Sequence, residues 1–199
     1  ATVRLDGSAA ASVAVDRRGM DYELPIGRYR VVVERFGYEP FRRTLEVEEN
    51  RTTRIQVNLE PLDFAVRSVD INRRRFSPNN GGALGRTRVS FTVTTPGRGT
   101  FQVADADGSL VYEKQLGPFR GPKQRVSWDG TISGTVAPDG RYELRIQGVG
   151  DGFDGADQVT RELVVDSSLV LRFRGTMSGV SGLSYSPLPD TLPADARQL

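Results

Sequence analysis

A Pro/Gly turn leading directly into a tyrosine occurs twice in this chain, and it constrains the fold more than any other feature. The first copy is Pro25-Ile26-Gly27-Arg28-Tyr29, and the second is Pro138-Asp139-Gly140-Arg141-Tyr142. Proline and glycine mark the turn, and the apolar alternation that follows marks a strand whose first inward residue is the tyrosine. The pattern is typical of small β-sandwich modules, and its repetition predicts two of them in tandem.

The composition removes several classes of chemistry. The 199 residues include no Cys and no His, which excludes Cys/His zinc sites, Cys nucleophiles, His general bases, His-containing triads and disulfides. The net charge of +2 gives no general attraction to nucleic acid or anionic lipid. No apolar run approaches the roughly 20 residues that span a bilayer. The chain starts at Ala1 rather than Met, so we expect a mature or excised fragment.

Residues 1–61 are expected to form the first sandwich. Alternation with a period of two predicts half-buried antiparallel strands. In the strand after Gly27, Tyr29 is inward, and in the last predicted strand Ile55, Val57 and Leu59 are inward. The other predicted strands of this unit are Thr2–Leu5, Ser12–Val15 and Phe41–Glu48, and the last is Thr53–Leu59.

Residues 62–174 are expected to form the second sandwich. About seven strands with turns every 8–12 residues or so are what an Ig-like sandwich requires. The predicted strands are Asp63–Asn72, Arg88–Thr95, Thr100–Val103, Leu110–Leu116, Gln124–Trp128, Arg141–Gln147 and Thr160–Val165. Residues 175–199 are rich in Gly, Ser and Pro and are expected to be an extended tail or linker. The fold class is therefore all-β, with two tandem antiparallel β-sandwiches of Ig-like or prealbumin-like type and an extended C-terminal tail.

The first unit resembles a PEGA domain. That family has an Ala-x-Val-x-Val-Asp-Gly strand and turn, then Leu-Pro-x-Gly-x-Tyr-x-Val-x-Val, then Gly-Tyr-x-Pro followed by Phe or Tyr. The matching segments here are Ala1–Gly7, Leu24–Val33 and Gly37–Phe41. The family has one more strand before the first of these segments, and its absence supports the expectation of truncation at Ala1.

The second unit looks like the Ig-like domain of flagellar hook-capping (FlgD-like) proteins. The segments that carry this resemblance come in the family's order: Phe76-Ser77-Pro78-Asn79, Asp105–Gly108, Trp128-Asp129-Gly130 and Pro138–Tyr142. Neither family is enzymatic, and both modules typically serve as scaffolding in the bacterial envelope or at the cell surface. The two resemblances together imply a bacterial envelope protein, periplasmic or surface-exposed, with no cofactor.

Several candidate sites have a structural alternative that the sequence favours. Trp128 follows Val126 at a spacing of two, so we expect core packing rather than an exposed sugar platform. Tyr29 and Tyr142 are expected to fill inward positions, with the hydroxyl reaching backbone at the rim. The turn residues Gly27, Asp129, Gly130, Asp139 and Gly140 complete this structural signature, and no catalytic residue is predicted.

A cation site and a basic patch are the remaining candidates. Asp151, Asp154 and Asp157 lie in a Gly-rich loop, where calcium could find several oxygens, but the EF-hand spacing is absent and a solvated turn is favoured. The runs Arg42-Arg43 and Arg73–Arg75 are interleaved with acidic residues, so solvated strand faces are favoured over a nucleic-acid surface.

Three functions follow from this interpretation. The first is a non-enzymatic scaffold or spacer whose partners are other envelope proteins or further domains of the same protein, with contacts made through exposed strand edges. The second is a module that binds polysaccharide such as peptidoglycan, for which exposure of Trp128 would be the discriminating feature. The third is a subunit of a flagellar or secretion apparatus. No partner nucleic acid and no membrane span in this fragment are expected.

Overall fold

The computed structural model describes residues 2–7, 24–80 and 82–169. These residues form strands, turns and extended segments, and no helix occurs among them. Accordingly, none of the described residues belongs to a helix that could cross a membrane. The predicted all-β class is confirmed. The predicted strand at 12–15 and the predicted tail at 175–199 lie outside the described residues.

The first unit is built on a three-stranded antiparallel sheet in the order β1-β2-β3. Its strands are β1 (Thr2–Gly7), β2 (Gly27–Glu34) and β3 (Phe41–Val47). The alternating residues of β2 place Tyr29, Val31 and Val33 in the buried layer, as the period of two predicts. Leu5 of β1 joins Val31 and Val33 in a small core.

The predicted strand Thr53–Leu59 is wrong as a sheet strand. Residues 51–60 are extended but belong to no sheet in the described part of the chain. Ile55, Val57 and Leu59 are nevertheless half-buried against the small core of the first unit. The period-two pattern therefore reports an extended backbone with one buried side, and it does not report hydrogen-bonded pairing with a neighbour.

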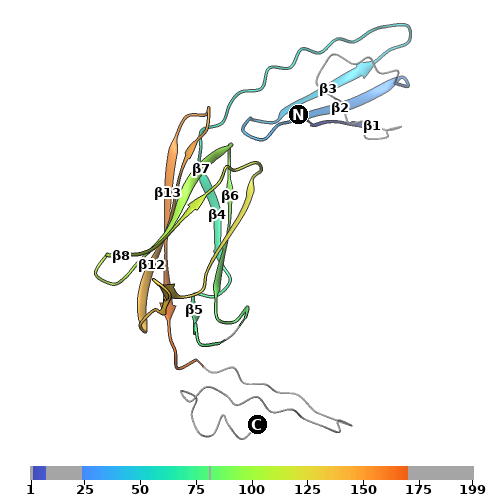
Figure 1. The fold of residues 1–199 in the computed structure, drawn as a ribbon. Coiled ribbons are helices and arrows are strands. Elements are labelled where there is room, and N and C mark those ends of the chain that lie inside the picture. The colour runs from blue at the N-terminus through green and yellow to red at the C-terminus, as the bar shows by residue number, and fades with distance from the viewer. Residues whose placement is uncertain (1, 8–23, 81, 170–199) are drawn as a thin grey trace, which may run out of the picture.

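The second unit is a two-sheet sandwich that lies beyond one end of the first sheet (Figure 1). One sheet has five strands in the order β5-β13-β12-β7-β8, and the other has three in the order β4-β6-β9. The strands of these sheets are β4 (Val66–Ile71), β5 (Arg75–Phe76), β6 (Thr87–Val93), β7 (Gly97–Ala104), β8 (Leu110–Leu116), β9 (Lys123–Trp128), β12 (Gly140–Gly150) and β13 (Ala156–Val165). A small hairpin of β10 (Thr131–Ile132) and β11 (Thr135–Val136) completes the unit.

Seven of these strands are longer than two residues, and each overlaps one of the strands predicted for an Ig-like sandwich. The hairpin predicted around residues 105–108 joins β7 to β8. The short elements β5, β10 and β11 were not predicted, because two-residue strands carry no periodicity. The core between the sheets is rich in aromatic and aliphatic side chains, among them Phe91, Phe101, Trp128, Leu144 and Leu163.

Candidate functional site

The two Pro/Gly–Tyr turns have the same local geometry. The hydroxyl of Tyr29 donates to the carbonyl of Pro25 at 2.8 Å, and the hydroxyl of Tyr142 donates to the carbonyl of Pro138 at 2.8 Å. Tyr29 is 2% exposed and Tyr142 is 5% exposed. Each tyrosine therefore buries its ring in a core and uses its hydroxyl to fasten the turn four residues before it, as predicted for both.

The Trp-Asp-Gly segment is also a structural element. Trp128 is 1% exposed and donates from its indole nitrogen to the carbonyl of Thr131 at 3.0 Å. The carboxylate of Asp129 accepts from the amide of Thr131 at 3.1 Å and from its hydroxyl at 2.7 Å. Gly130 adopts a φ of 73°, where a Cβ would lie 2.4 Å from Pro78, so the turn requires glycine.

The indole of Trp128 is enclosed by other rings. It lies 5.5 Å from Tyr142, 5.9 Å from Phe76 and 6.3 Å from Tyr112, measured between ring centroids. The contacts with Tyr142 and Phe76 are edge to face, an arrangement that stabilises aromatic cores. Trp128 is therefore core, as predicted, and no face of it is available to stack on a sugar.

The second signature aspartate fastens the last described residues to the sandwich. Both oxygens of Asp139 accept from Ser167, one from its amide at 2.8 Å and one from its hydroxyl at 2.7 Å. Close by, Asp166 accepts from the amide and hydroxyl of Ser168 and pairs with Arg75. The hydrogen bonds from Ser168 and the guanidinium of Arg75 hold the pKa of Asp166 below its usual range.

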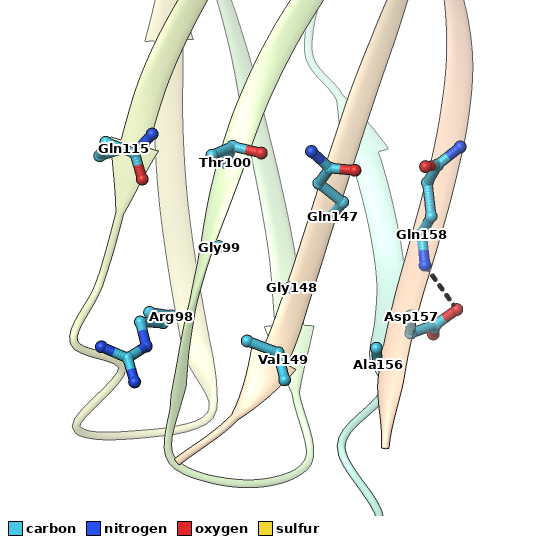
Figure 2. Close-up of a pocket in the computed structure, with 10 residues that line it drawn as sticks. All are labelled: Arg98, Gly99, Thr100, Gln115, Gln147, Gly148, Val149, Ala156, Asp157 and Gln158. Carbon is cyan, nitrogen blue, oxygen red and sulfur yellow. Dashed lines mark hydrogen bonds between the residues drawn. The ribbon is translucent and has the colours of Figure 1, made fainter.

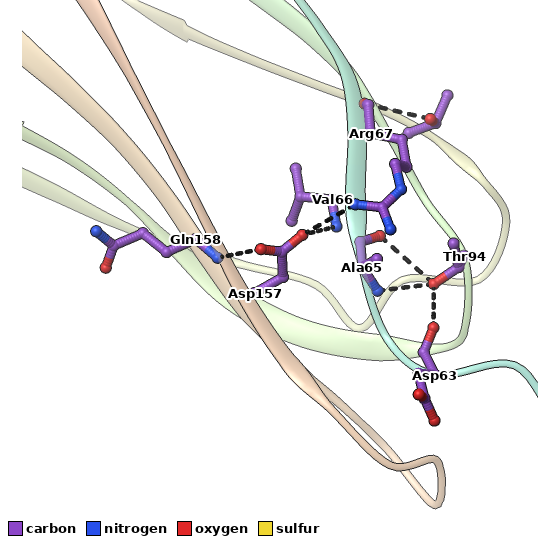
Figure 3. A network of polar contacts seen from close by, with 8 residues as sticks. Asp63, Ala65, Val66, Arg67, Thr94, Asp157 and Gln158 are labelled. Carbon is purple, nitrogen blue, oxygen red and sulfur yellow. Dashed lines mark hydrogen bonds and ion pairs between the residues drawn. The ribbon is translucent and has the colours of Figure 1, made fainter.

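The candidate cation loop gains no support from the structure. Among the described residues there is no group of three or more acidic side chains placed to hold a metal. The carboxylate of Asp157 instead accepts from the amide of Val66 at 2.9 Å and pairs with Arg67 at 3.5 Å (Figure 3). Through these bonds Asp157 connects β13 of the five-stranded sheet to β4 of the three-stranded sheet. Its role is therefore structural.

The same loop carries a residue that the sequence interpretation missed. Phe153 meets Tyr38 of the first unit edge to face, with ring centroids 5.4 Å apart. A Cβ on Gly37 would lie 2.6 Å from the ring of Phe153, so the loop between β2 and β3 fits Phe153 only because it has glycine there, at a φ of 92°. Arg35 lies over the other ring, 4.5 Å from the Tyr38 centroid. An aromatic residue alone among Asp and Gly was the signal in the sequence.

Backbone hydrogen bonds hold the joint from both sides. Toward the first unit, the amide of Leu62 donates to the carbonyl of Gly37 at 2.9 Å, and the amide of Glu39 donates to the carbonyl of Glu60 at 2.9 Å. Toward the second unit, the amide of Phe64 donates to the carbonyl of Asp154 at 2.6 Å. The short link between the units is thus hydrogen-bonded to the β2–β3 loop and to the β12–β13 loop at once. We refer to Gly37, Tyr38, Leu62, Phe64 and Phe153 as the joint.

A second feature lies on the outer face of the five-stranded sheet. A groove of about 510 Å³ is lined there by residues of β7, β8, β12 and β13 (Figure 2). Its side chains include the three amides of Gln115, Gln147 and Gln158, and its lining includes the paired backbone of Gly99 and Gly148. Strand register is what brings these side chains together, so sequence reasoning did not find the groove.

The basic runs do not form one surface. Arg75 pairs with Asp166, and Arg73 donates to the carbonyl of Ala83 at 3.1 Å. Arg42 and Arg43 are exposed on β3, in the other unit. The two runs therefore lie on different units.

Comparisons with known proteins find a matching family model in each unit. The family model of the PEGA domain matches residues 1–63, and that of the FlgD Ig-like domain matches residues 77–152. A solved structure titled "Biofilm associated protein - BSP domain" is 12% identical, with a TM-score of 0.30 and an alignment over 85% of this chain. The alignment spans 25% of that longer chain. No curated protein matches the sequence.

Proposed function

We propose that this chain, a PEGA domain followed by a FlgD Ig-like domain, is a non-enzymatic spacer that holds its neighbours in a bacterial envelope assembly at a fixed distance and angle. Both matched domains are structural modules, and their combination is that of a bacterial surface or envelope protein. We place it in the periplasm or at the cell surface. Its partners in this proposal are other envelope proteins or further domains of the same protein.

The joint is the observation that carries the proposal. Domains connected by a plain linker move relative to one another by default. Here the link is hydrogen-bonded in both directions, and Tyr38 and Phe153 interlock across it. An aromatic pair of this kind contributes about 0.5–1.5 kcal/mol beyond its buried area. These contacts oppose bending at the joint between the two units, which a spacer of fixed length and angle must resist.

The placement of the chain ends within the described structure also suits a spacer. The first sheet lies at the end of the sandwich that carries the turn between β12 and β13. The last described residues leave the sandwich from the opposite end (Figure 1). A force applied at the two ends would therefore act along the strands of the sandwich. Asp139 and Asp166 fasten the chain at the far end through Ser167 and Ser168.

A distance measurement tests the proposal. The chain has no Cys, so Thr44→Cys with Asp107→Cys allows two spin labels at exposed positions, one in each unit. We expect a narrow distance distribution, which Phe153→Ala broadens. The matched control Asp151→Ala, an exposed side chain in the same loop, should leave it narrow.

Two results would contradict this function. A broad distance distribution in the unmodified joint would mean that the units move independently and set no fixed spacing. Catalytic turnover of a glycan or peptide substrate by the purified chain would contradict its non-enzymatic role.

A further inference from the structure

The outer groove of the Ig-like unit presents one continuous row of side chains. Strand register aligns Gln115 of β8 with Thr100 of β7, Thr100 with Gln147 of β12, and Gln147 with Gln158 of β13. Figure 2 shows these four side chains at one level across four neighbouring strands. Because neighbouring strands lie about 4.8 Å apart, the row is about 14 Å long.

Most polar groups of this row have no partner in the described part of the chain. No hydrogen bond of that part involves the side-chain amides of Gln147 and Gln158, whereas the amide of Gln115 donates to Glu113 at 3.3 Å. Thr100, the remaining member of the row, has a buried hydroxyl that forms no hydrogen bond within the described residues. Gln158 is exposed and Gln147 is half-buried, so the donors and acceptors of both amides are accessible to a ligand.

The next level of the groove adds one cation and one apolar contact. Register places Arg98 beside Val149, and Val149 beside Ala156. Val149 is 44% exposed, and no ion pair engages Arg98 among the described residues. The acidic residue of the groove, Asp157, is already paired with Arg67. The groove therefore offers a ligand amides, a small apolar patch and one guanidinium that is free of ion pairs.

This chemistry suits a glycan better than a protein. Amides donate and accept at once, as sugar hydroxyls do, and an extended row can follow a chain of sugars. Protein interfaces concentrate their affinity in aromatic and other large anchors, and the groove has no aromatic residue. The free guanidinium of Arg98 matches a carboxylate.

We propose that the groove formed by Gln115, Thr100, Gln147 and Gln158, with Arg98 at its end, is a binding site for an acidic glycan, a chain of sugars that carry carboxylates. The amides of Gln147 and Gln158 bind hydroxyls along the chain, and Arg98 binds a carboxylate. This site differs from a Trp128 platform, since Trp128 is in the core. It goes beyond the spacer function, which stands or falls independently on the distance measurement at the joint.

Nuclear magnetic resonance titration of the whole chain tests the site. The probe is a hexamer of galacturonic acid, and chitohexaose serves as the neutral comparison. We expect the acidic probe to shift backbone amides at 98–100, 147–149 and 156–158, and to bind more tightly than chitohexaose. The double variant Gln147→Leu/Gln158→Leu should bind at least about tenfold more weakly, because two hydrogen-bonding amides are lost.

Matched variants separate binding from folding. Gln56→Leu removes an exposed amide from the first unit and should bind like the unmodified chain. Arg98→Gln keeps a polar side chain and should abolish the preference for the acidic probe. Unchanged dispersion of the amide spectrum shows that each variant is folded.

Clear outcomes overturn the proposal. Absence of groove shifts at about 10 mM of the acidic probe would exclude even weak binding. Equal binding of the two probes would refute the assignment of an acidic ligand. Shifts confined to other faces, or undiminished binding by the double variant, would show that the row is not the site.

Discussion

Removal of one hydroxyl from the Ig-like unit tests how its Pro/Gly turn is held. In Tyr142→Phe the ring stays in the core, but the 2.8 Å bond to the carbonyl of Pro138 is lost. A neutral hydrogen bond of this kind contributes about 1 kcal/mol to the free energy of unfolding. For a unit of about 100 residues that loss lowers the melting temperature by roughly 5 °C.

Trp128 provides the assay for this variant. It is the one tryptophan of the chain, and it is buried 5.5 Å from the ring of Tyr142. Its emission therefore reports unfolding of the Ig-like unit during urea or thermal denaturation. Tyr112→Phe is the matched control, because the hydroxyl of Tyr112, another tyrosine of this cluster, has no hydrogen bond among the described residues.

The control decides the interpretation. If Tyr142→Phe and Tyr112→Phe lower the unfolding midpoint equally, the bond to Pro138 contributes nothing and the reasoning is refuted. The twin variant Tyr29→Phe should weaken the PEGA unit by a similar amount, since its bond to Pro25 is also 2.8 Å long. Hydrogen exchange of the β2 amides measures that loss.

Because of Tyr142, we expect the stability of the Ig-like unit to depend on pH in the alkaline range. Burial raises the pKa of Tyr142 above its ordinary value of 10.0, and the carboxylates of Asp105 and Asp139 add to the effect. The folded state therefore resists losing this proton, so the associated stability is present below about pH 10 and is lost as the pH rises above it. The free energy of unfolding of Tyr142→Phe should therefore decline less steeply with pH in this range. Urea midpoints taken between about pH 9 and about pH 11.5 measure the difference.

Two further changes test the packing and the far end of the sandwich. Gly148→Ala should destabilise the Ig-like unit by about 1–3 kcal/mol, because its Cβ would lie 2.6 Å from the ring of Phe64; an unchanged urea midpoint would contradict this packing. Asp166 has a lowered pKa, so its stabilising effect is present above about pH 4 and is lost as the pH falls through its folded-state value. Asp166→Asn should lower the urea midpoint at neutral pH and make the midpoint less dependent on pH in the acid range. If its midpoints instead run parallel to those of the unmodified chain, the role assigned to the bonds of Asp166 with Ser168 and Arg75 is disproved.

Local chemistry made much of the fold predictable. Tyr29, Tyr142 and Trp128 are core residues because each sits at an inward position of an alternating strand, and the hydroxyl bonds of the two tyrosines follow from the turns before them. The two family resemblances rested on these turns. They are confirmed by family models that match the two units in the predicted order.

The same reasoning failed where the outcome depended on a neighbour. Thr53–Leu59 alternates as cleanly as any strand, yet it pairs with no sheet among the described residues. Asp157 looked like one of three loop carboxylates, but its partners Val66 and Arg67 are about 90 residues away in sequence. Phe153 gave one signal, an aromatic residue in a polar loop, and the surface it meets belongs to the other unit.

The sequence by itself determined which residues face inward and where the chain turns, because a period of two and Pro/Gly turn chemistry act over a few residues. Only the tertiary structure decided which strands are neighbours and in what register. That alignment is set by packing and hydrogen bonds summed over segments far apart in the chain, and a shift by one residue would reverse every side chain of a strand. The joint at Phe153 and the row from Gln115 to Gln158 exist only through that alignment.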